Sequence, residues 1–235
     1  MNLSVRDSAL AELMDDPACD PVRLRRTHDR FRAVNRAVAC WGSVYRTLLR
    51  PELAAAGRPV RILDIGCGSG DVLRRLVRLA ERDGFEVSGV GIDPDPRALE
   101  AARDGGAGRS IDFRTARSSD LVAAGERFDV VVSNHLLHHL DAASLAAVIA
   151  DSEVLAERIS AHSDIARGRI AYSAFAVAAL PLAPGSFIRV DGLRSIRRSY
   201  TAAELTAALP PGWTVERPGR FRLLAVRRPG TAASR

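Results

Sequence analysis

The chain has 235 residues, which is enough to bury one sizeable core and leaves room for a small accessory segment. Apolar residues make up 47% and charged residues 26%, proportions that are ordinary for a soluble globular protein. The net charge of +6 rests on arginine alone, because the chain contains no lysine, and this favours a coding bias over a nucleic-acid binding surface. Only 5% of the residues are aromatic and able to stack on bases, so we expect no nucleic-acid partner.

Short sequence features predict the compartment and the redox state. The stretch MNLSVRDSALAELMDDP lacks the apolar core of a secretory signal. The apolar stretch 170–183 is interrupted by Pro181 and is shorter than the roughly 20 residues that span a bilayer. The few cysteines, Cys19, Cys40 and Cys67, argue against a disulfide framework. We therefore expect a cytoplasmic protein, with an anionic membrane surface as an alternative partner for the basic charge.

The N-terminal region, residues 1–56, is predicted to be a helical cap. Apolar residues recur there at three- and four-residue spacing and form one stripe, which comprises Phe31, Val34, Val38, Trp41, Tyr45 and Leu48. Arginines occupy most of the other helix faces. The stripe indicates a helix that docks on the main domain, residues 57–235, and such a helix could also cover a ligand.

The segment 60–76, VRILDIGCGSGDVLRRL, is the centre of the prediction. It begins with a short apolar run that has the length and β-branched content of a buried strand. Gly66, Gly68 and Gly70 follow, and after them the apolar spacing becomes helical. A strand, a glycine loop and a helix in this order bring backbone close to a ligand at a helix N-terminus. A dinucleotide fingerprint, GxGxxG, would need its last glycine where the chain has Asp71, so a nucleoside ligand without phosphates fits better.

Further strands and helices alternate along the chain. Asp93 ends a strand predicted over 85–92, and a carboxylate at this place can accept hydrogen bonds from both hydroxyls of a ribose. Further strands are predicted over 111–115, 128–133 and 158–161, and a helix over 142–155. This alternation predicts an α/β fold with a doubly wound, mostly parallel sheet.

The C-terminal third of the chain is predicted from three further features. Residues 165–200 are irregular in pattern and too long for a simple connection, so we expect a substrate-covering insertion with helical pieces. Thr201 and Glu204 form a capping box that opens a helix. Residues 213–216 and 221–226 predict an antiparallel C-terminal hairpin, which completes a Rossmann-like sheet of seven strands.

Two of these segments resemble motifs of the class I S-adenosylmethionine (SAM) dependent methyltransferases. DIGCGSG, residues 64–70, is similar to motif I of that family, and Asp93 follows at a matching place. FDVVVSNHLLHHL, residues 128–140, resembles the fourth-strand motif of the family. The segment 28–46 is loosely similar to the N-terminal helices that lie over the SAM pocket in ubiquinone and menaquinone C-methyltransferases. The likeness to the methyltransferase fold covers residues 60–226.

The resemblance implies SAM as the cofactor and a set of contacts to it. The corresponding positions in this chain are Asp64, Gly66, Gly68, Gly70, Asp93, Ser118 and Asn134. The glycines would admit the methionine and ribose portions, and Asp93 would hold the ribose. Asp64 would orient the loop or the amino group and Asn134 would lie near the sulfonium, although strand-end capping is left open for both. Ser118 stands near the place where many relatives carry an acidic residue that accepts from the adenine amino group.

Four of the five histidines follow the predicted fourth and fifth strands, at the edge where open α/β sheets bind ligands. A histidine there can take the proton of a phenol or enol acceptor during methyl transfer. His135 and His162 are the catalytic candidates, whereas a structural role is favoured for His138 and His139. A metal site that includes His135, His139 and Asp141 is a third interpretation, but no H-E-x-x-H pattern is present and we expect no metal.

Together these features predict methyl transfer from SAM to a small, largely apolar acceptor, such as a phenolic or polyketide-like secondary metabolite. The clustered histidines favour O-methylation over C-methylation. The insertion is expected to line an apolar pocket with Tyr172, Phe175, Leu180, Leu182, Phe187 and Ile188. One alternative is a nicotinamide-dependent oxidoreductase, against which the missing third glycine of the fingerprint and the absence of a Tyr-x-x-x-Lys pair both argue. The other is a protein that binds SAM or S-adenosylhomocysteine (SAH) without transfer activity.

Overall fold

Seven strands form one sheet in the order β3-β2-β1-β4-β5-β7-β6. This computed structural model describes residues 3–104 and 110–230. The strands are β1 (Val60–Ile65), β2 (Val87–Asp93), β3 (Ile111–Thr115), β4 (Phe128–Asn134), β5 (Ala156–Ile165), β6 (Thr214–Gly219) and β7 (Arg222–Arg227). Strands β1 to β5 pair in parallel, and β7 runs antiparallel to both β5 and β6. The predicted α/β class, the mostly parallel sheet and the antiparallel C-terminal hairpin are therefore confirmed.

Helices cover both faces of this sheet. One face is covered by α2 (Trp41–Val44), a π-helical segment (Tyr45–Leu49), α3 (Arg50–Ala56), α4 (Asp71–Arg82) and α5 (Pro96–Asp104). The other face is covered by α6 (Ser118–Ala123), α7 (Ala142–Leu155) and α10 (Ala202–Ala208). In β1, Ile62 packs into the core of the first face and Leu63 into that of the second, because successive side chains of a strand point to opposite faces.

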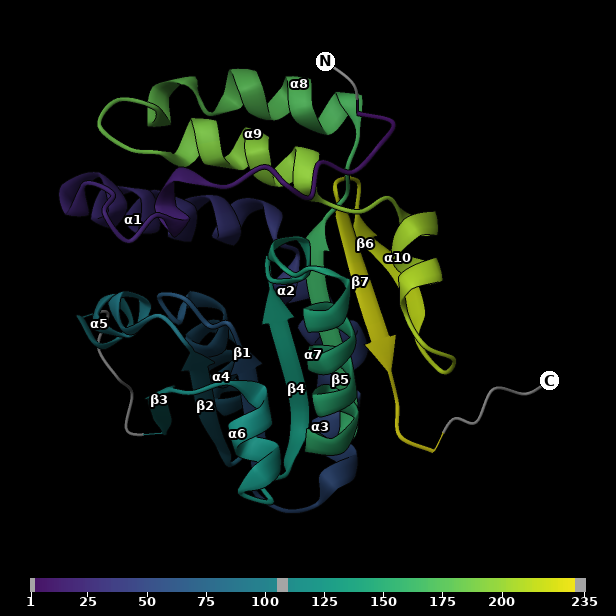
Figure 1. The fold of residues 1–235 in the computed structure, drawn as a ribbon. Helices are drawn as coiled ribbons and strands as arrows, with labels where there is room; N and C mark the ends of the chain where they lie inside the picture. The colour runs from purple at the N-terminus through teal and green to yellow at the C-terminus, as the bar shows by residue number, and fades with distance from the viewer. Residues whose placement is uncertain (1–2, 105–109, 231–235) are drawn as a thin grey trace.

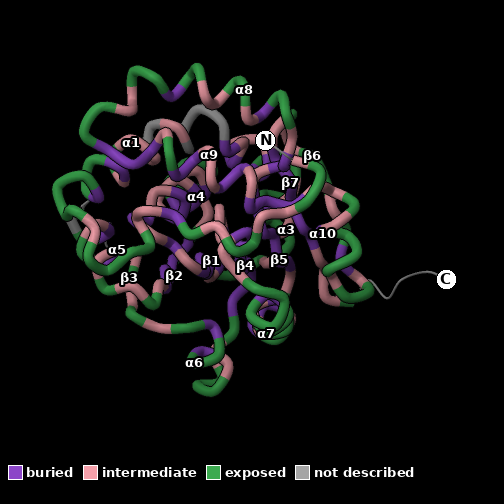
Figure 2. The backbone as a smooth tube through the Cα atoms, turned by 45° about the horizontal axis from the view of Figure 1, so that its top comes forward, coloured by how far each residue is buried: buried purple, intermediate pink, exposed green. Residues whose placement is uncertain are grey.

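A third layer lies over the carboxyl ends of the parallel strands. It contains α1 (Pro21–Val38), α8 (Arg169–Ala178) and α9 (Ile188–Arg198), with the extended N-terminal segment running along α9 (Figure 1). Asp191 of α9 accepts the backbone N–H groups of Leu13 and Met14 at 2.8 and 3.0 Å, which fixes that segment. Figure 2 shows the central strands of the sheet mostly buried and α8 exposed along most of its length. Among the described residues no helix is long and apolar enough to cross a membrane.

The N-terminal region differs from its prediction at Cys40. This residue adopts a left-handed conformation with φ of 58° and separates α1 from α2, so the prediction of one stripe through Leu48 is wrong. Trp41, Tyr45 and Leu53 pack into the same core as β1 and α4. The division into a cap of residues 1–56 and a main domain of residues 57–235 stays a proposal, and these contacts favour counting α2 and α3 with the sheet.

Strand β5 is longer than its predicted span of 158–161. Residues 160–165 pair with residues 222–227 of β7, and this antiparallel partner extends β5 through Ile165. The helical pieces expected within residues 165–200 are present as α8 and α9, and the helix predicted over 142–155 is α7. The capping box is also present, because Thr201 Oγ1 accepts the N–H of Glu204 while Glu204 Oε2 accepts that of Thr201.

Candidate active site

A cavity of about 410 Å³ lies where the carboxyl ends of β1, β2 and β4 meet the overlying helices. Residues 66–69 of the glycine loop and 93–95 at the end of β2 line one side of it. The N-terminal segment and α1 line the opposite side, through Met14, Leu24 and Phe31 among others. The helical cap therefore covers the edge at which open α/β sheets bind their ligands.

The glycine loop presents its backbone to this cavity at Gly68. This residue has φ of 53°, and a Cβ added there would meet nothing within 4 Å. Its N–H donates to Asp93 Oδ2 at 3.1 Å, so the loop and the end of β2 are joined beside the open space. Gly70 has φ of 71° but does not line the cavity, and a Cβ there would lie 2.4 Å from the ring of Phe113. Gly70 is thus required for packing. Because it does not line the cavity, it offers no surface there for the predicted contact to a cofactor.

Acidic side chains dominate the cavity next to the loop. Asp64 is 1% exposed, and its Oδ1 has no hydrogen-bond partner within the described part of the chain. Burial raises the pKa of Asp64 well above its ordinary value, and the charges of Asp71 and Asp93 raise it further. Burial also raises the pKa of Asp93, although the N–H groups of Asp95 and Gly68 oppose this. A cationic ligand group would relieve this concentration of negative charge.

Asn134 and His135, at the end of β4, line the cavity and are held by a buried arginine from β7. Arg222 donates from Nη2 to Asn134 Oδ1 at 2.7 Å and from Nη1 to His135 Nε2 at 2.5 Å. Burial lowers the pKa of Arg222 to about 10, so it remains charged near neutral pH. Burial, with the nearby Arg222 charge, places the pKa of His135 well below its ordinary value. His135 is therefore neutral, and its unprotonated Nε2 is occupied.

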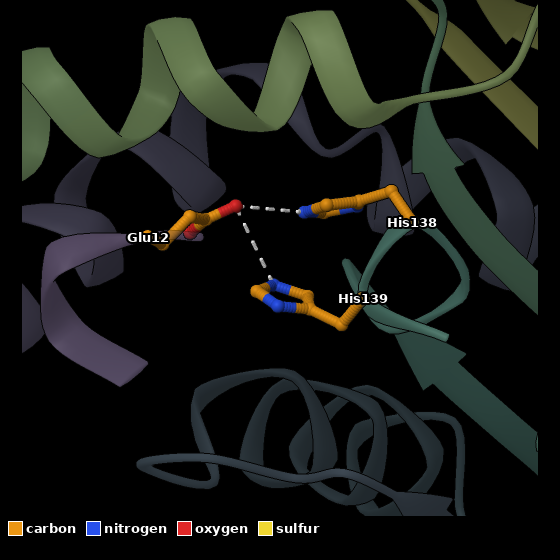
Figure 3. A group of neighbouring side chains, drawn as sticks. All are labelled: Glu12, His138 and His139. Carbon is orange, nitrogen blue, oxygen red and sulfur yellow. Dashed lines mark ion pairs between the residues drawn. The ribbon is translucent and has the colours of Figure 1, made fainter. Parts of the chain in front are cut away.

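The remaining two histidines of this loop form a charged cluster with the N-terminal segment (Figure 3). His138 Nδ1 lies 2.6 Å from Asp164 Oδ1, and its Nε2 lies 3.5 Å from Glu12 Oε1. Burial lowers the pKa of His138, but the two carboxylates outweigh burial and raise it to about 9. His139 Nε2 faces the same Glu12 oxygen at 3.8 Å. Glu12, His138 and His139 all line the cavity.

His162 occupies a different place from the one predicted. It lies within β5 rather than beyond it, is 0% exposed and does not line the cavity. Its Nδ1 hydrogen-bonds Ser133 Oγ at 2.8 Å, and its ring stacks on the ring of Trp213 with 5.4 Å between the ring centroids. Burial lowers the pKa of His162 to about 4, so the ring is neutral. A side chain in this position contacts no ligand in the cavity, and we assign His162 to the core instead of to proton transfer.

Ser118 and most of the insertion also lie away from the cavity. Ser118 begins α6, and its hydroxyl donates to Asp151 Oδ2 at 2.6 Å. Of the insertion, residues 165–200, only Ser195 lines the cavity. None of the six apolar residues expected to line a pocket lines this cavity, and Phe175 packs on Gly192 between α8 and α9. Apolar lining comes instead from the N-terminal segment and α1.

Three residues that hold this site were not among the predicted site residues. Arg222 and Asp164 lie on strands whose pairing brings them to His135 and His138, and Glu12 comes from the N-terminal segment. Of these three residues, only Asp164 could have been found from the sequence, because it follows two polar residues at the expected end of the strand predicted over 158–161. Arg222 and Glu12 belong to arginine-rich and acidic stretches in which no local pattern distinguishes them.

Comparison with known proteins identifies the part of the chain that supplies most of the cavity lining. Residues 62–157 match the family model described as a methyltransferase domain. They include the glycine loop, Asp93, Asn134 and His135. This region is a class I methyltransferase domain. The resemblance noted for DIGCGSG and FDVVVSNHLLHHL is thereby confirmed.

Curated relatives of the methyltransferase domain cover part of the chain. The ubiquinone biosynthesis O-methyltransferase of Cereibacter sphaeroides (strain ATCC 17025 / ATH 2.4.3) is 42% identical over 83 residues, which cover 34% of this chain and 31% of that protein. The protein of that name from Mesorhizobium japonicum is 32% identical over 123 residues, which cover 47% of this chain and 45% of that protein. The matched region thus spans about a third to a half of the length of these relatives.

Solved structures share the fold over most of the chain. The plantazolicin methyltransferase BpumL, in complex with a pentazolic desmethylPZN analog and SAH, has a TM-score of 0.64 at 13% identity and covers 91% of each chain. Magnesium protoporphyrin IX methyltransferase (ChlM) from Synechocystis PCC 6803, with bound SAM, has a TM-score of 0.52 at 18% identity. That match covers 90% of this chain and 99% of the other. These likenesses extend the shared fold beyond the residues of the family model.

Proposed function

We propose that this chain binds SAM in the cavity and transfers its methyl group to a small, largely apolar acceptor. The observation that carries the proposal is the acidic lining around Asp64 and Asp93. Of the described arginines, Arg97 alone lines the cavity, and its guanidinium is paired with Asp95 at 2.7 Å. SAM carries a sulfonium and an ammonium group, whereas a nicotinamide dinucleotide carries a pyrophosphate. Charge therefore favours SAM over the dinucleotide of the alternative oxidoreductase.

The residues around the glycine loop fit such a ligand. Gly68 leaves open space where its side chain would be, next to the carboxylate of Asp93. Each Asp93 oxygen already accepts one backbone N–H, from Gly68 or Asp95, and each retains a second lone pair for a ribose hydroxyl. The unpartnered Oδ1 of Asp64 would accept from the amino group of the methionine portion. Asn134 would lie toward the sulfonium, with its side chain fixed by Arg222.

The acceptor is proposed to be a phenolic or polyketide-like molecule, and O-methylation is favoured over C-methylation. Two observations support this choice. Several curated relatives are named for O-methylation in ubiquinone biosynthesis. In addition, Met14, Leu24 and Phe31 give the cavity apolar walls on the side of the cap. A flat, mostly apolar ring with one hydroxyl group would match such walls.

In the proposed reaction SAM supplies an electrophilic methyl group, and the protein supplies orientation and exclusion of water. The N-terminal segment and α1 would exclude water, because they close the cavity opposite the glycine loop. His135 is retained as the proposed contact to the acceptor. Its action as a base requires that Arg222 release Nε2, since the lone pair of a ring nitrogen that accepts from a guanidinium is not free to take a proton.

The proposal is tested by methyl transfer in vitro. The purified protein is incubated with methyl-labelled SAM and either simple phenols or carbon nucleophiles of similar size, and labelled product and SAH are measured. We expect SAH release that depends on a phenol and is lost in Asp93→Asn. SAM binding with no transfer to either acceptor class would favour the alternative of a binding protein. Oxidation of NADPH in place of transfer would favour the oxidoreductase.

A further inference from the structure

We propose that Glu12, His138 and His139 bind a divalent transition-metal ion of the zinc type at the wall of the cavity. His138 Nε2 and His139 Nε2 lie 3.5 and 3.8 Å from Glu12 Oε1 (Figure 3). One ligand atom from each residue lies within 4.8 Å of the other two. Ligand atoms held about 2.0–2.1 Å from zinc in a tetrahedron are roughly 3.4 Å apart. Small side-chain rotations therefore bring all three atoms to bonding distance.

Each histidine has a carboxylate on its other nitrogen. Asp164 Oδ1 lies 2.6 Å from His138 Nδ1, and Asp15 Oδ2 lies 3.5 Å from His139 Nδ1. Metal-binding histidines almost always donate the second ring N–H to a carboxylate, carbonyl or water, which fixes the tautomer that leaves the other nitrogen free for the metal. Here both histidines are oriented with Nε2 toward the same oxygen of Glu12. The arrangement is that of a metal site with its outer partners in place.

The Nε2 atom of His138 supplies an independent observation. His138 is 1% exposed, and its Nε2 has no hydrogen-bond partner within the described residues. A buried polar atom without a partner is costly, and the few that occur in folded proteins call for an explanation. The dashed line in Figure 3 joins this atom to Glu12 across a gap that is too long for a hydrogen bond. A metal ion in that gap would satisfy both groups.

The charges around the cluster also favour a cation. Glu12, Asp15 and Asp164 face the two histidines, and Ser195 Oγ donates to Glu12 Oε1 at 2.8 Å. Two arginines oppose this negative charge: Arg198 Nη1 lies 3.4 Å from Asp15 and 3.9 Å from Glu12, and the charge of Arg222 acts on Asp164. The three carboxylates around the two histidines nevertheless favour a divalent cation between them.

Three protein ligands leave a fourth position, as in catalytic rather than structural zinc sites. Because all three ligands line the cavity that also contains Gly68 and Asp93, the fourth ligand would come from the cavity. If the proposed methyl transfer is correct, on which this step rests, that ligand is the acceptor oxygen. A metal ion lowers the pKa of a bound hydroxyl group. The acceptor would then be reactive even though Nε2 of His135 accepts from Arg222 and cannot act as the base.

The test is direct metal binding. Protein made without a histidine tag is stripped with a chelator and titrated with Co²⁺, whose visible absorption reports four-coordinate binding, and then with Zn²⁺ in competition. We expect one equivalent of metal per chain, and affinities at least about 10-fold lower in Glu12→Gln, His138→Gln and His139→Gln. The matched control is His28→Gln, which removes a different histidine of the same cavity and is expected to leave the affinity unchanged.

Two results would overturn the proposal: no stoichiometric Co²⁺ signal in the wild-type protein, or equal affinity in His139→Gln and wild type. Circular dichroism checks that each variant is folded. If His138→Gln fails to fold, His139→Gln decides, because its side chain is 28% exposed and less embedded in the core. The titration contains neither SAM nor acceptor. Metal binding without methyl transfer therefore refutes only the proposed function, and methyl transfer without metal binding refutes only this site.

Discussion

Arg222 is 3% exposed, and its Nη1 donates to His135 Nε2 over 2.5 Å. The same side chain donates from Nη2 to Asn134 and to Ser163, so one arginine joins β7 to the ends of β4 and β5. A guanidinium has no acceptor, which fixes the direction of every one of these hydrogen bonds. The tautomer of His135 follows from this residue, and Asn134 is oriented by Arg222 together with Trp41, whose Nε1 donates to Asn134 Oδ1 at 3.1 Å.

Replacement of Arg222 by Met should destabilise the fold and release His135. His135 and Ser163 lose this donor, whereas Asn134 Oδ1 keeps the N–H of Trp41 Nε1, so we expect the free energy of unfolding to fall by about 2–4 kcal/mol, measured in urea. The pKa of His135, followed by NMR, should rise toward its ordinary value, although burial still holds it down. Arg220→Met is the matched control, because Arg220 is exposed and its change should affect neither quantity. If the pKa of His135 is unchanged in Arg222→Met, Arg222 is not a cause of its low value.

Two glycines of the loop should respond differently to alanine. Gly70→Ala adds a Cβ 2.4 Å from Phe113 at a positive φ, and we expect it to destabilise the fold by about 2–4 kcal/mol. Gly68→Ala meets no atom within 4 Å, so only the left-handed backbone opposes it, by about 1 kcal/mol. Its methyl group would instead occupy ligand space, and SAM affinity should fall at least about 10-fold. Equal loss of stability in both variants would contradict this distinction.

Asp64→Asn should stabilise the ligand-free protein while weakening SAM binding. Because the pKa of Asp64 is raised on folding, ionisation of its carboxyl disfavours the folded state at neutral pH, and an uncharged amide removes that penalty. We expect a gain of roughly 1–3 kcal/mol in urea unfolding near pH 7.5. The thermal shift produced by SAM should shrink in the same variant. If ligand-free Asp64→Asn were less stable than the ligand-free wild type, the ionised carboxylate of Asp64 would stabilise the fold, which contradicts this prediction.

His162 should make the fold weaker in mild acid. Its pKa is about 4 in the folded protein against an ordinary value of 6.5, so the unfolded chain takes up the proton first as the pH falls. The stability that neutral His162 contributes is therefore complete above about pH 7 and is lost as the pH falls through 6.5 toward 4. Between about pH 7.5 and 5.5 this loss is on the order of 1 kcal/mol. His162→Gln should show a flatter pH profile of urea stability, and a profile parallel to wild type would exclude this cause.

Most of the sheet could be predicted from the sequence, because each of its signals is local. The apolar run at 60–65, the helix at 142–155 and the capping box of Thr201 each depend on neighbouring residues only. The motifs around Gly68 and Asp93 were located correctly at the cavity for the same reason. The end of β5 was missed because it depends on pairing with β7, more than fifty residues later in the chain.

That one error explains the wrong placement of His162. A strand that ends at residue 161 would put His162 at the ligand edge, whereas pairing with Ala225 keeps it inside the sheet. The roles of Glu12 and Arg222 depend on contacts between distant segments, which no local pattern encodes. Ser118 was placed by analogy with other methyltransferases, and here its hydroxyl is taken by Asp151.

The central claim is that the acidic cavity beside Gly68 and Asp93 binds SAM. It is tested most directly by calorimetric titration of the wild-type protein and of Asp93→Asn with SAM, SAH and NADPH. Asparagine retains one side-chain oxygen acceptor, so loss of binding in a variant with wild-type thermal stability would report on the ligand rather than on the loop. We predict SAM and SAH binding at about micromolar affinity, at least about 10-fold weaker in the variant, and no binding of NADPH. Binding of NADPH without SAM or SAH would contradict the account and make the glycine loop an atypical dinucleotide turn.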